Sequence, residues 1–167
     1  MTCKRALNLG ALSLITLGLF ASTANAATET ATIAVTATVA ATCTLAADSL
    51  EFPAYTGAED VTASADLSVT CSNTAPYVVS LGMGNGVGAT ADARLMSGGV
   101  GGNDTLAYQL FQDDAGSIAW GNTTGTDTLA GTGDGTEQTL TVHGVIAAGQ
   151  ESSIGDYSDS VVASIDY

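Results

Sequence analysis

Residues 31–41 read Ala-Thr-Ile-Ala-Val-Thr-Ala-Thr-Val-Ala-Ala, and this alternation is the clearest structural signal in the chain. Successive side chains of a β-strand point to opposite faces of the sheet. The stretch is therefore predicted to be a strand with one apolar face and one face made mostly of threonine. The apolar face consists of Ala31, Ile33, Val35, Ala37, Val39 and Ala41.

Shorter alternating runs follow, separated by clusters of Gly, Asn and Asp. This pattern predicts an all-β domain, a sandwich or a barrel. Strands are expected at residues 67–71, 77–81, 106–110, 140–146 and 161–167, with 118–120 as a short partner strand. Residues 82–102 are rich in Gly and are expected to be a long irregular connection, and residues 121–137 are expected to be polar and rich in turns.

The first 26 residues have the order of a secretory signal peptide. Lys4 and Arg5 precede an apolar run, and Ala24-Asn25-Ala26 supplies small residues for cleavage. The run is short for a membrane span of about 20 residues, although a retained N-terminal anchor remains the alternative. We expect an exported mature chain that starts at Ala27 and has no later segment apolar enough to enter a membrane.

Charge excludes some partners. All 17 acidic residues follow Ala26, and Arg94 is the only basic residue there, so the mature chain has a formal net charge of −16. Such a surface repels nucleic acid and anionic lipids. Regular Val, Ile and Leu nevertheless indicate a folded chain, and about 140 residues are enough for one domain with its own core.

Cysteine use agrees with export. Once Cys3 leaves with the signal, Cys43 and Cys71 are the only pair, and an oxidising compartment favours a disulfide between them. Closing that loop would stabilise the fold by roughly 3–4 kcal/mol. Two cysteines without a nearby His cannot complete a zinc site, so no metal is expected.

The last predicted strand alternates to the final residue, through Val161, Ala163, Ile165 and Tyr167, and no later segment could pair with its open side. A spare strand at residues 31–41 and an open edge here suggest exchange of a strand between subunits. Burying Ile33, Val35 and Val39 in a neighbour could contribute roughly 5–9 kcal/mol, an upper bound. The alternative is that residues 31–39 pair within their own domain.

Several motifs, in this order, resemble the spore coat protein U domain family, which includes subunits of archaic (Csu-type) chaperone–usher pili. The resemblance covers the whole mature chain. It rests on the Thr/apolar strand that leads to Cys43, Leu67-Ser68-Val69-Thr70-Cys71, Arg94-Leu95-Met96, Leu106-Ala107-Tyr108-Gln109-Leu110-Phe111, Trp120-Gly121 and Gly155-Asp156-Tyr157-Ser158-Asp159-Ser160-Val161 through Tyr167.

The resemblance implies an incomplete immunoglobulin-like sandwich that lacks its final strand. A periplasmic chaperone would lend a strand, and the N-terminal segment of the next pilin would replace it at an outer-membrane usher. By this resemblance, residues 27–41 are the donor segment, and residues 42–167 are the pilin domain. The inserting side chains would be Ile33, Val35, Ala37 and Val39, the groove-edge residues Val161, Ala163, Ile165 and Tyr167, and the family's disulfide Cys43–Cys71.

Two features depart from the family pattern. The chain is unusually acidic, and its donor segment is rich in alanine, at Ala31, Ala37 and Ala41. Small side chains fill pockets less well, so the contact between subunits is expected to be weaker than one made by a Val/Ile-rich donor strand.

Other candidate chemistry is weak. The glycines of residues 82–88 have no following Lys or helix, so a phosphate loop is disfavoured. Asp127, Asp134 and Glu137 could ligate calcium but lack EF-hand spacing. Asp113 and Asp114 are adjacent and suit a solvated turn better than a catalytic carboxylate pair. His143 is not accompanied by the Gly-x-Ser-x-Gly motif of a catalytic triad. Trp120 and Tyr108 are expected to be core residues.

The leading hypothesis is therefore a structural, non-enzymatic shaft pilin without cofactors, displayed on the cell surface and supporting adhesion and biofilm formation. The alternative is a secreted coat or ligand-binding domain of the same fold that does not polymerise. A secreted enzyme has no supporting constellation of residues.

Overall fold

Short extended segments dominate the computed structural model, which describes residues 26–167 and contains no helix within that range. Hence nothing in these residues forms an apolar helix of membrane-spanning length. The strands all lie in the compact unit Thr38–Tyr167. They are β1 (Cys43–Ala47), β2 (Val61–Cys71), β3 (Pro76–Leu81), β4 (Arg94–Gly98), β5 (Asp104–Phe111), β6 (Leu129–Thr132), β7 (Glu137–Ile146), β8 (Tyr157–Ser158) and β9 (Ala163–Asp166).

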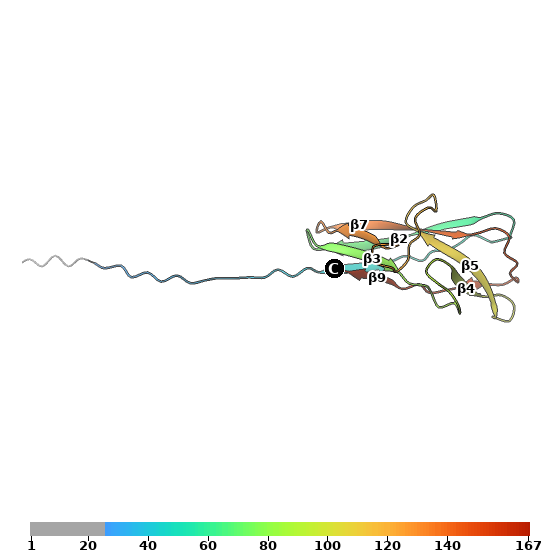
Figure 1. Cartoon of the computed structure of the whole chain (residues 1–167), viewed down its shortest axis with the longest axis horizontal. Helices are drawn as coiled ribbons and strands as arrows, with labels where there is room; N and C mark the ends of the chain where they lie inside the picture. The colour runs from blue at the N-terminus through green and yellow to red at the C-terminus, as the bar shows by residue number, and fades with distance from the viewer. Residues whose placement is uncertain (1–25) are drawn as a thin grey trace, which may run out of the picture. The chain divides into compact units, whose positions relative to one another are not determined.

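The strands form two antiparallel sheets, with orders β1-β2-β7-β5-β4-β8 and β6-β3-β9. Figure 1 shows β3 beside its partner β9. In the larger sheet β2 and β7 pair over ten residues, from Val61↔Ile146 to Thr70↔Glu137. Inward-facing side chains of both sheets form one core, because alternate residues of each strand point the same way. Its members include Leu67, Val69, Val79, Leu81, Leu110, Trp120 and Ile146. The all-β sandwich predicted from the sequence is confirmed.

Most predicted strands are present, with altered bounds. The strand predicted at residues 67–71 extends back to Val61, and the last strand is limited to Ala163–Asp166. Residues 118–120 pair with β5 only through the bridge Phe111↔Ala119 and its flanking hydrogen bonds.

Residues 82–102, which were wrongly predicted to be a wholly irregular connection, and residues 121–137, which were predicted to be rich in turns, each contain a strand. β4 lies inside the first, where it pairs with β5 from Arg94↔Tyr108 to Gly98↔Asp104. β6 lies inside the second and pairs with β3. Both strands are short and contain glycine, so they lack a clear alternation and depend on the partner strand for their conformation.

Residues 26–42 belong to no strand of the structure, although residues 31–41 have the strongest strand pattern in the sequence. Their apolar side chains are open to solvent: Ile33, Val35 and Val39 are 83%, 87% and 94% exposed. The proposed signal peptide, residues 1–26, lies almost entirely outside the described residues.

Candidate functional site

A groove of about 1090 Å³ opens into the apolar core of the domain. Residues 47–57 line one wall, and Gln150, residues 152–159, Val161 and Ala163 line the other. The floor is formed by core side chains that include Leu67, Leu81, Leu110, Val142 and Ile146. These floor side chains are at most 6% exposed, whereas Val161 and Ala163 on the second wall are only half-buried.

The first wall is the connection between β1 and β2, residues 48–57. Leu50, Phe52 and Tyr55 are half-buried and pack against the core. Gly144 on β7 makes room for them, because a Cβ there would come within 2.7 Å of Phe52 Cζ. Phe52 also meets the ring of Tyr108 edge to face, at 6.1 Å between centroids. The wall is thus held mainly by side chains.

The backbone of this wall is largely unpaired. Backbone–backbone hydrogen bonds tie only its ends, from Asp48 N to Asp66 O and from Gly149 N to Gly57 O, at 2.9 Å each. Within the described residues, positions 49–56 make no such bond. Unpaired N–H and C=O groups beside an apolar groove are the features that accept an added strand.

Asp104 fixes the second wall. Its carboxylate accepts hydrogen bonds from Ser153 N at 2.6 Å, Thr105 N at 2.9 Å and Tyr157 Oη at 3.1 Å. These donors favour the charged carboxylate, chiefly through the Ser153 amide, and lower the pKa of Asp104 to about 2. The wall is therefore anchored by a group that remains ionised at all but very acidic pH.

Asp159 secures the same wall nearer β9. Its Oδ2 accepts from Tyr108 Oη at 2.7 Å, and its Oδ1 accepts from Asn85 N and Ser160 N at 2.7 Å each. Burial, together with the bond to Asp159, raises the pKa of Tyr108. Gly84 has φ +83° and lies against this carboxylate, so a side chain there would collide with it.

β9, which contains two of the four residues predicted to border the groove, is an edge strand of its sheet. It pairs with β3 from Val78↔Asp166 to Leu81↔Ala163, and no other strand of residues 26–167 is hydrogen-bonded to its far side. Val161 and Ala163 line the groove, Ile165 packs against the core without lining it, and Tyr167 is 61% exposed. Three of the four predicted edge residues thus face the core.

The predicted disulfide Cys43–Cys71 is confirmed and lies in the first register pair of β1 and β2. Next to it, Ser72 N donates to Thr42 O at 2.9 Å, and Thr42 N donates to Ser72 Oγ at 3.1 Å. The chain that leads from residues 27–41 is therefore fixed to the domain where β1 begins. Of the proposed donor residues, Ile33, Val35 and Val39 are well exposed, as given above, and Ala37 is exposed as well.

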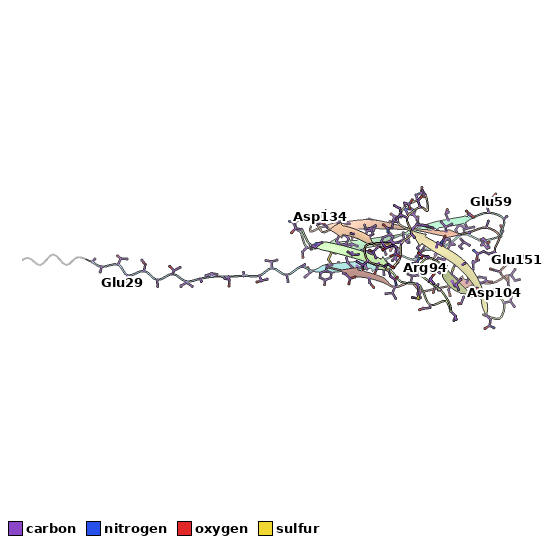
Figure 2. All side chains as sticks on the ribbon, in the orientation of Figure 1. Glu29, Glu59, Arg94, Asp104, Asp134 and Glu151 are labelled. Carbon is purple, nitrogen blue, oxygen red and sulfur yellow. A yellow bond between two sulfur atoms is a disulfide. The ribbon has the colours of Figure 1, made fainter. Side chains whose placement is uncertain are left out.

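Sequence reasoning missed the role of Arg94, which is fully buried between the sheets (Figure 2). Its guanidinium donates hydrogen bonds of 2.6–3.0 Å to four backbone carbonyl oxygens, those of Leu81, Gly82, Ala91 and Trp120. Burial lowers its pKa. The one sequence signal for this role was that Arg94 is the only Lys or Arg after residue 26 of a strongly acidic chain.

The weaker candidates do not assemble a site. His143 Nδ1 lies 3.8 Å from Asp114 on the outer face of the larger sheet. Asp113 accepts from Ser117 N and Ile118 N, as expected in a turn. Asp127 and Asp134 accept from backbone amides of their own loops, and no metal-ligating cluster occurs within residues 26–167. Trp120 and Tyr108 are core residues, as predicted.

Comparisons with known proteins agree with this architecture. Protein U of Myxococcus xanthus is 36% identical over 111 residues, which make up 65% of this chain and 62% of that protein. The chain thus spans less than two thirds of its relative's length.

Among solved structures, the fold is similar to the CsuC–CsuE chaperone–tip adhesion subunit pre-assembly complex from the archaic chaperone–usher Csu pili of Acinetobacter baumannii. The TM-score is 0.59 and the identity 21%, covering 78% of this chain and 41% of the other. Residues 29–164 match the family described as Spore Coat Protein U domain. Because this match covers most of the chain, the protein belongs to the spore coat protein U domain family.

Proposed function

We propose that this chain is a structural subunit of a surface pilus, assembled when residues 27–41 of one subunit enter the groove of the next. The observation that carries the proposal is the groove beside β9, where half-buried apolar side chains and unpaired backbone occur at the same place. An exposed alternating segment on the same chain has the complementary character. Each feature supplies what the other lacks.

The chemistry of the two surfaces matches. An inserted strand would pair its backbone with β9 and turn one face toward the groove floor. Ile33, Val35, Ala37 and Val39 form an apolar face suited to that floor, and the threonines would face outward. No catalytic group is needed, so the role is structural and not enzymatic.

The partners follow from the same groove. An unpaired sheet edge beside an apolar groove is an aggregation hazard, so a chaperone strand would fill the groove before assembly. The likeness to a chaperone–subunit complex supports this partner, and we extend it to an outer-membrane usher and to other pilins. The location would be the cell surface, reached through the periplasm, and we extend the proposal to a shaft role that supports adhesion and biofilm formation.

Deleting residues 27–39 tests the proposal in cells that express the chaperone and usher. The truncated chain should bind the chaperone and form no fibres by electron microscopy, because it has an acceptor groove and no donor. The full-length control Thr32→Ser/Thr36→Ser/Thr38→Ser, altered only on the threonine face, should still assemble. Fibres from the truncated chain would refute donor-strand assembly.

The family description, and the relative named protein U, favour a second candidate: a secreted coat domain that does not polymerise. In that case residues 31–39 would pair within their own sheet in the purified monomer. Hydrogen exchange distinguishes the two candidates, because self-pairing would protect these amides without any partner.

A further inference from the structure

The Cys43–Cys71 disulfide lies where the proposed donor segment meets the domain. We propose that it carries tension from that segment directly to the β3–β9 pair, and so keeps tension away from the groove wall at residues 48–57. This inference rests on the proposed function, because it assumes that subunits are joined through residues 27–41. It assigns a mechanical function to the disulfide beyond its contribution to stability.

Tension would reach the domain at Thr42 and Cys43. Only residues 40–42 separate Val39 from Cys43. Thr42 is held to Ser72 by backbone and side-chain hydrogen bonds, including Thr42 Oγ1 to Ser72 Oγ at 3.0 Å. A pull on the inserted donor segment therefore acts on the first residue pair of the β1–β2 ladder.

Without the disulfide, tension would run along the backbone through β1 into the groove wall. β1 is an edge strand with five register pairs. The wall that follows it is held mainly by Leu50, Phe52 and Tyr55, with backbone bonds only at its ends. Peeling β1 would pull these side chains out, widen the groove and release the donor strand bound there.

The disulfide provides a shorter route. From Cys71 the chain passes through residues 72–75 into β3, which pairs with β9, the proposed contact for the neighbour's donor strand. The turn is fixed by Thr74 N to Gly133 O and Gly133 N to Ala75 O, at 2.8 Å each. Tension would therefore enter and leave the subunit without passing through the wall.

β3 is suited to this role because it is the most firmly held strand of its sheet. Its inward residues Tyr77, Val79 and Leu81 are 0–4% exposed. Trp120 Nε1 donates to Val79 O at 3.1 Å, and Arg94 Nη2 donates to Leu81 O at 3.0 Å. These bonds anchor β3 to residues outside the ladder, so it should resist displacement longer than β1.

Stretching single assembled fibres with optical tweezers tests the inference, before and after a phosphine reductant opens the disulfide. Thiol counting by alkylation would verify reduction. Each reduced subunit should gain up to about 100 Å of length before rupture, from the 28 residues that the disulfide bypasses. Oxidised fibres should lack this gain and rupture at higher force.

A force series separates this function from a general loss of stability. Under the proposal, the ratio of subunit-loss rates, reduced over oxidised, should rise with applied force. A ratio independent of force, or reduced fibres without added extension, would overturn the inference. Alkylated but unreduced fibres are the control, and the Cys43→Ser/Cys71→Ser variant provides a second route if its fibres assemble.

The outcomes also separate the two proposals. If chains lacking residues 27–39 form fibres, tension does not enter at Thr42 and both proposals fail. If fibres require residues 27–39 but reduction changes neither extension nor the force dependence, the donor-strand proposal stands and the mechanical one fails.

Discussion

Strands β3 and β9 are neighbours in one sheet, paired by four residues, yet their inward faces differ in burial. Those of β3 are at most 4% exposed, whereas Ala163 and Ile165 of β9 are only half-buried. β3 has β6 on one side and β9 on the other, while β9 pairs with β3 alone within residues 26–167. The inward face of β3 is therefore covered, and that of β9 is covered only in part.

Alternation along a strand therefore indicates which face is apolar, but not whether that face is covered. Coverage depends on neighbours and on loops that cross the edge, here residues 48–57 and 150–159. The contrast also separates two kinds of residue. Those around β3 should determine the stability of the single chain, and those around β9 should matter when the groove is filled.

The largest expected effect on the stability of the single chain comes from Arg94→Met, in the region around β3. The change leaves the buried carbonyls of Leu81 and Trp120 without donors and should lower the free energy of unfolding by about 3–5 kcal/mol. Urea denaturation followed by fluorescence of Trp120, the only tryptophan, measures this. The nearby exposed Asp92→Asn is the matched control and should change stability by less than about 0.5 kcal/mol. A loss below about 1 kcal/mol for Arg94→Met would contradict the assigned role.

Val79→Ala and Ile165→Ala compare the two regions directly. In the single chain, Val79→Ala should cost about 2 kcal/mol, because it leaves a cavity at a fully buried site. Ile165→Ala should cost no more than about 1 kcal/mol there, since its side chain is only partly buried.

In assembled fibres, measured by dissociation in denaturant, Ile165→Ala should no longer have the smaller effect of the two substitutions. Ile165 does not line the groove, but a donor strand paired with β9 should cover the exposed part of its side chain. The truncation Ile165→Ala should then weaken the fibre by about 2–4 kcal/mol. Equal effects of Ile165→Ala in the single chain and in the fibre would indicate that the groove is not filled beside β9.

Substitutions in the donor segment should have graded effects on assembly. Ile33→Ala, Val35→Ala or Val39→Ala should each weaken the joint by about 1–3 kcal/mol, because each removes most of one buried apolar side chain. Thr36→Ala on the opposite face is the control and should have little effect. Dissociation rates of purified fibres measure the difference, and equal rates for Ile33→Ala and Thr36→Ala would argue against an inward apolar face.

The smallest effect concerns pH. Because the folded pKa of Asp104 is depressed to about 2, its hydrogen bonds should stabilise the second groove wall fully above pH 4. That stabilisation should be lost as the pH falls from about 4 to about 2. Over this interval the protection of the Ser153 amide, which is its intrinsic exchange rate divided by the observed rate, should fall. In the Asp104→Asn variant this protection should depend less on pH. Identical pH profiles would exclude Asp104 as the anchor.

Much of the fold could be predicted from the sequence, because long alternating strands such as β2, β5 and β7 carry their own pattern. β4, β6 and β8 could not be predicted, because they are two to five residues long and depend on neighbours for their pairing. The disulfide could be predicted, since only one pair of cysteines remains after residue 3.

The site was only partly predictable. Alternation identified Val161, Ala163 and Ile165 as an inward face, but residues 48–57 have no clear period and gave no sign of forming the opposite wall. The periodicity of the sequence does not reveal the role of Arg94, because that role depends on carbonyl groups from three separate segments. Contacts between distant segments are the part that local sequence does not encode.

Hydrogen exchange of residues 31–39, measured in the purified single chain and in assembled fibres, shows whether this segment is inserted into a neighbouring subunit. Exchange should be fast in the single chain, where the segment belongs to no strand, and strongly slowed in fibres, where it pairs beside β9. Protection already present in the single chain, or fast exchange in the fibre, would contradict this insertion.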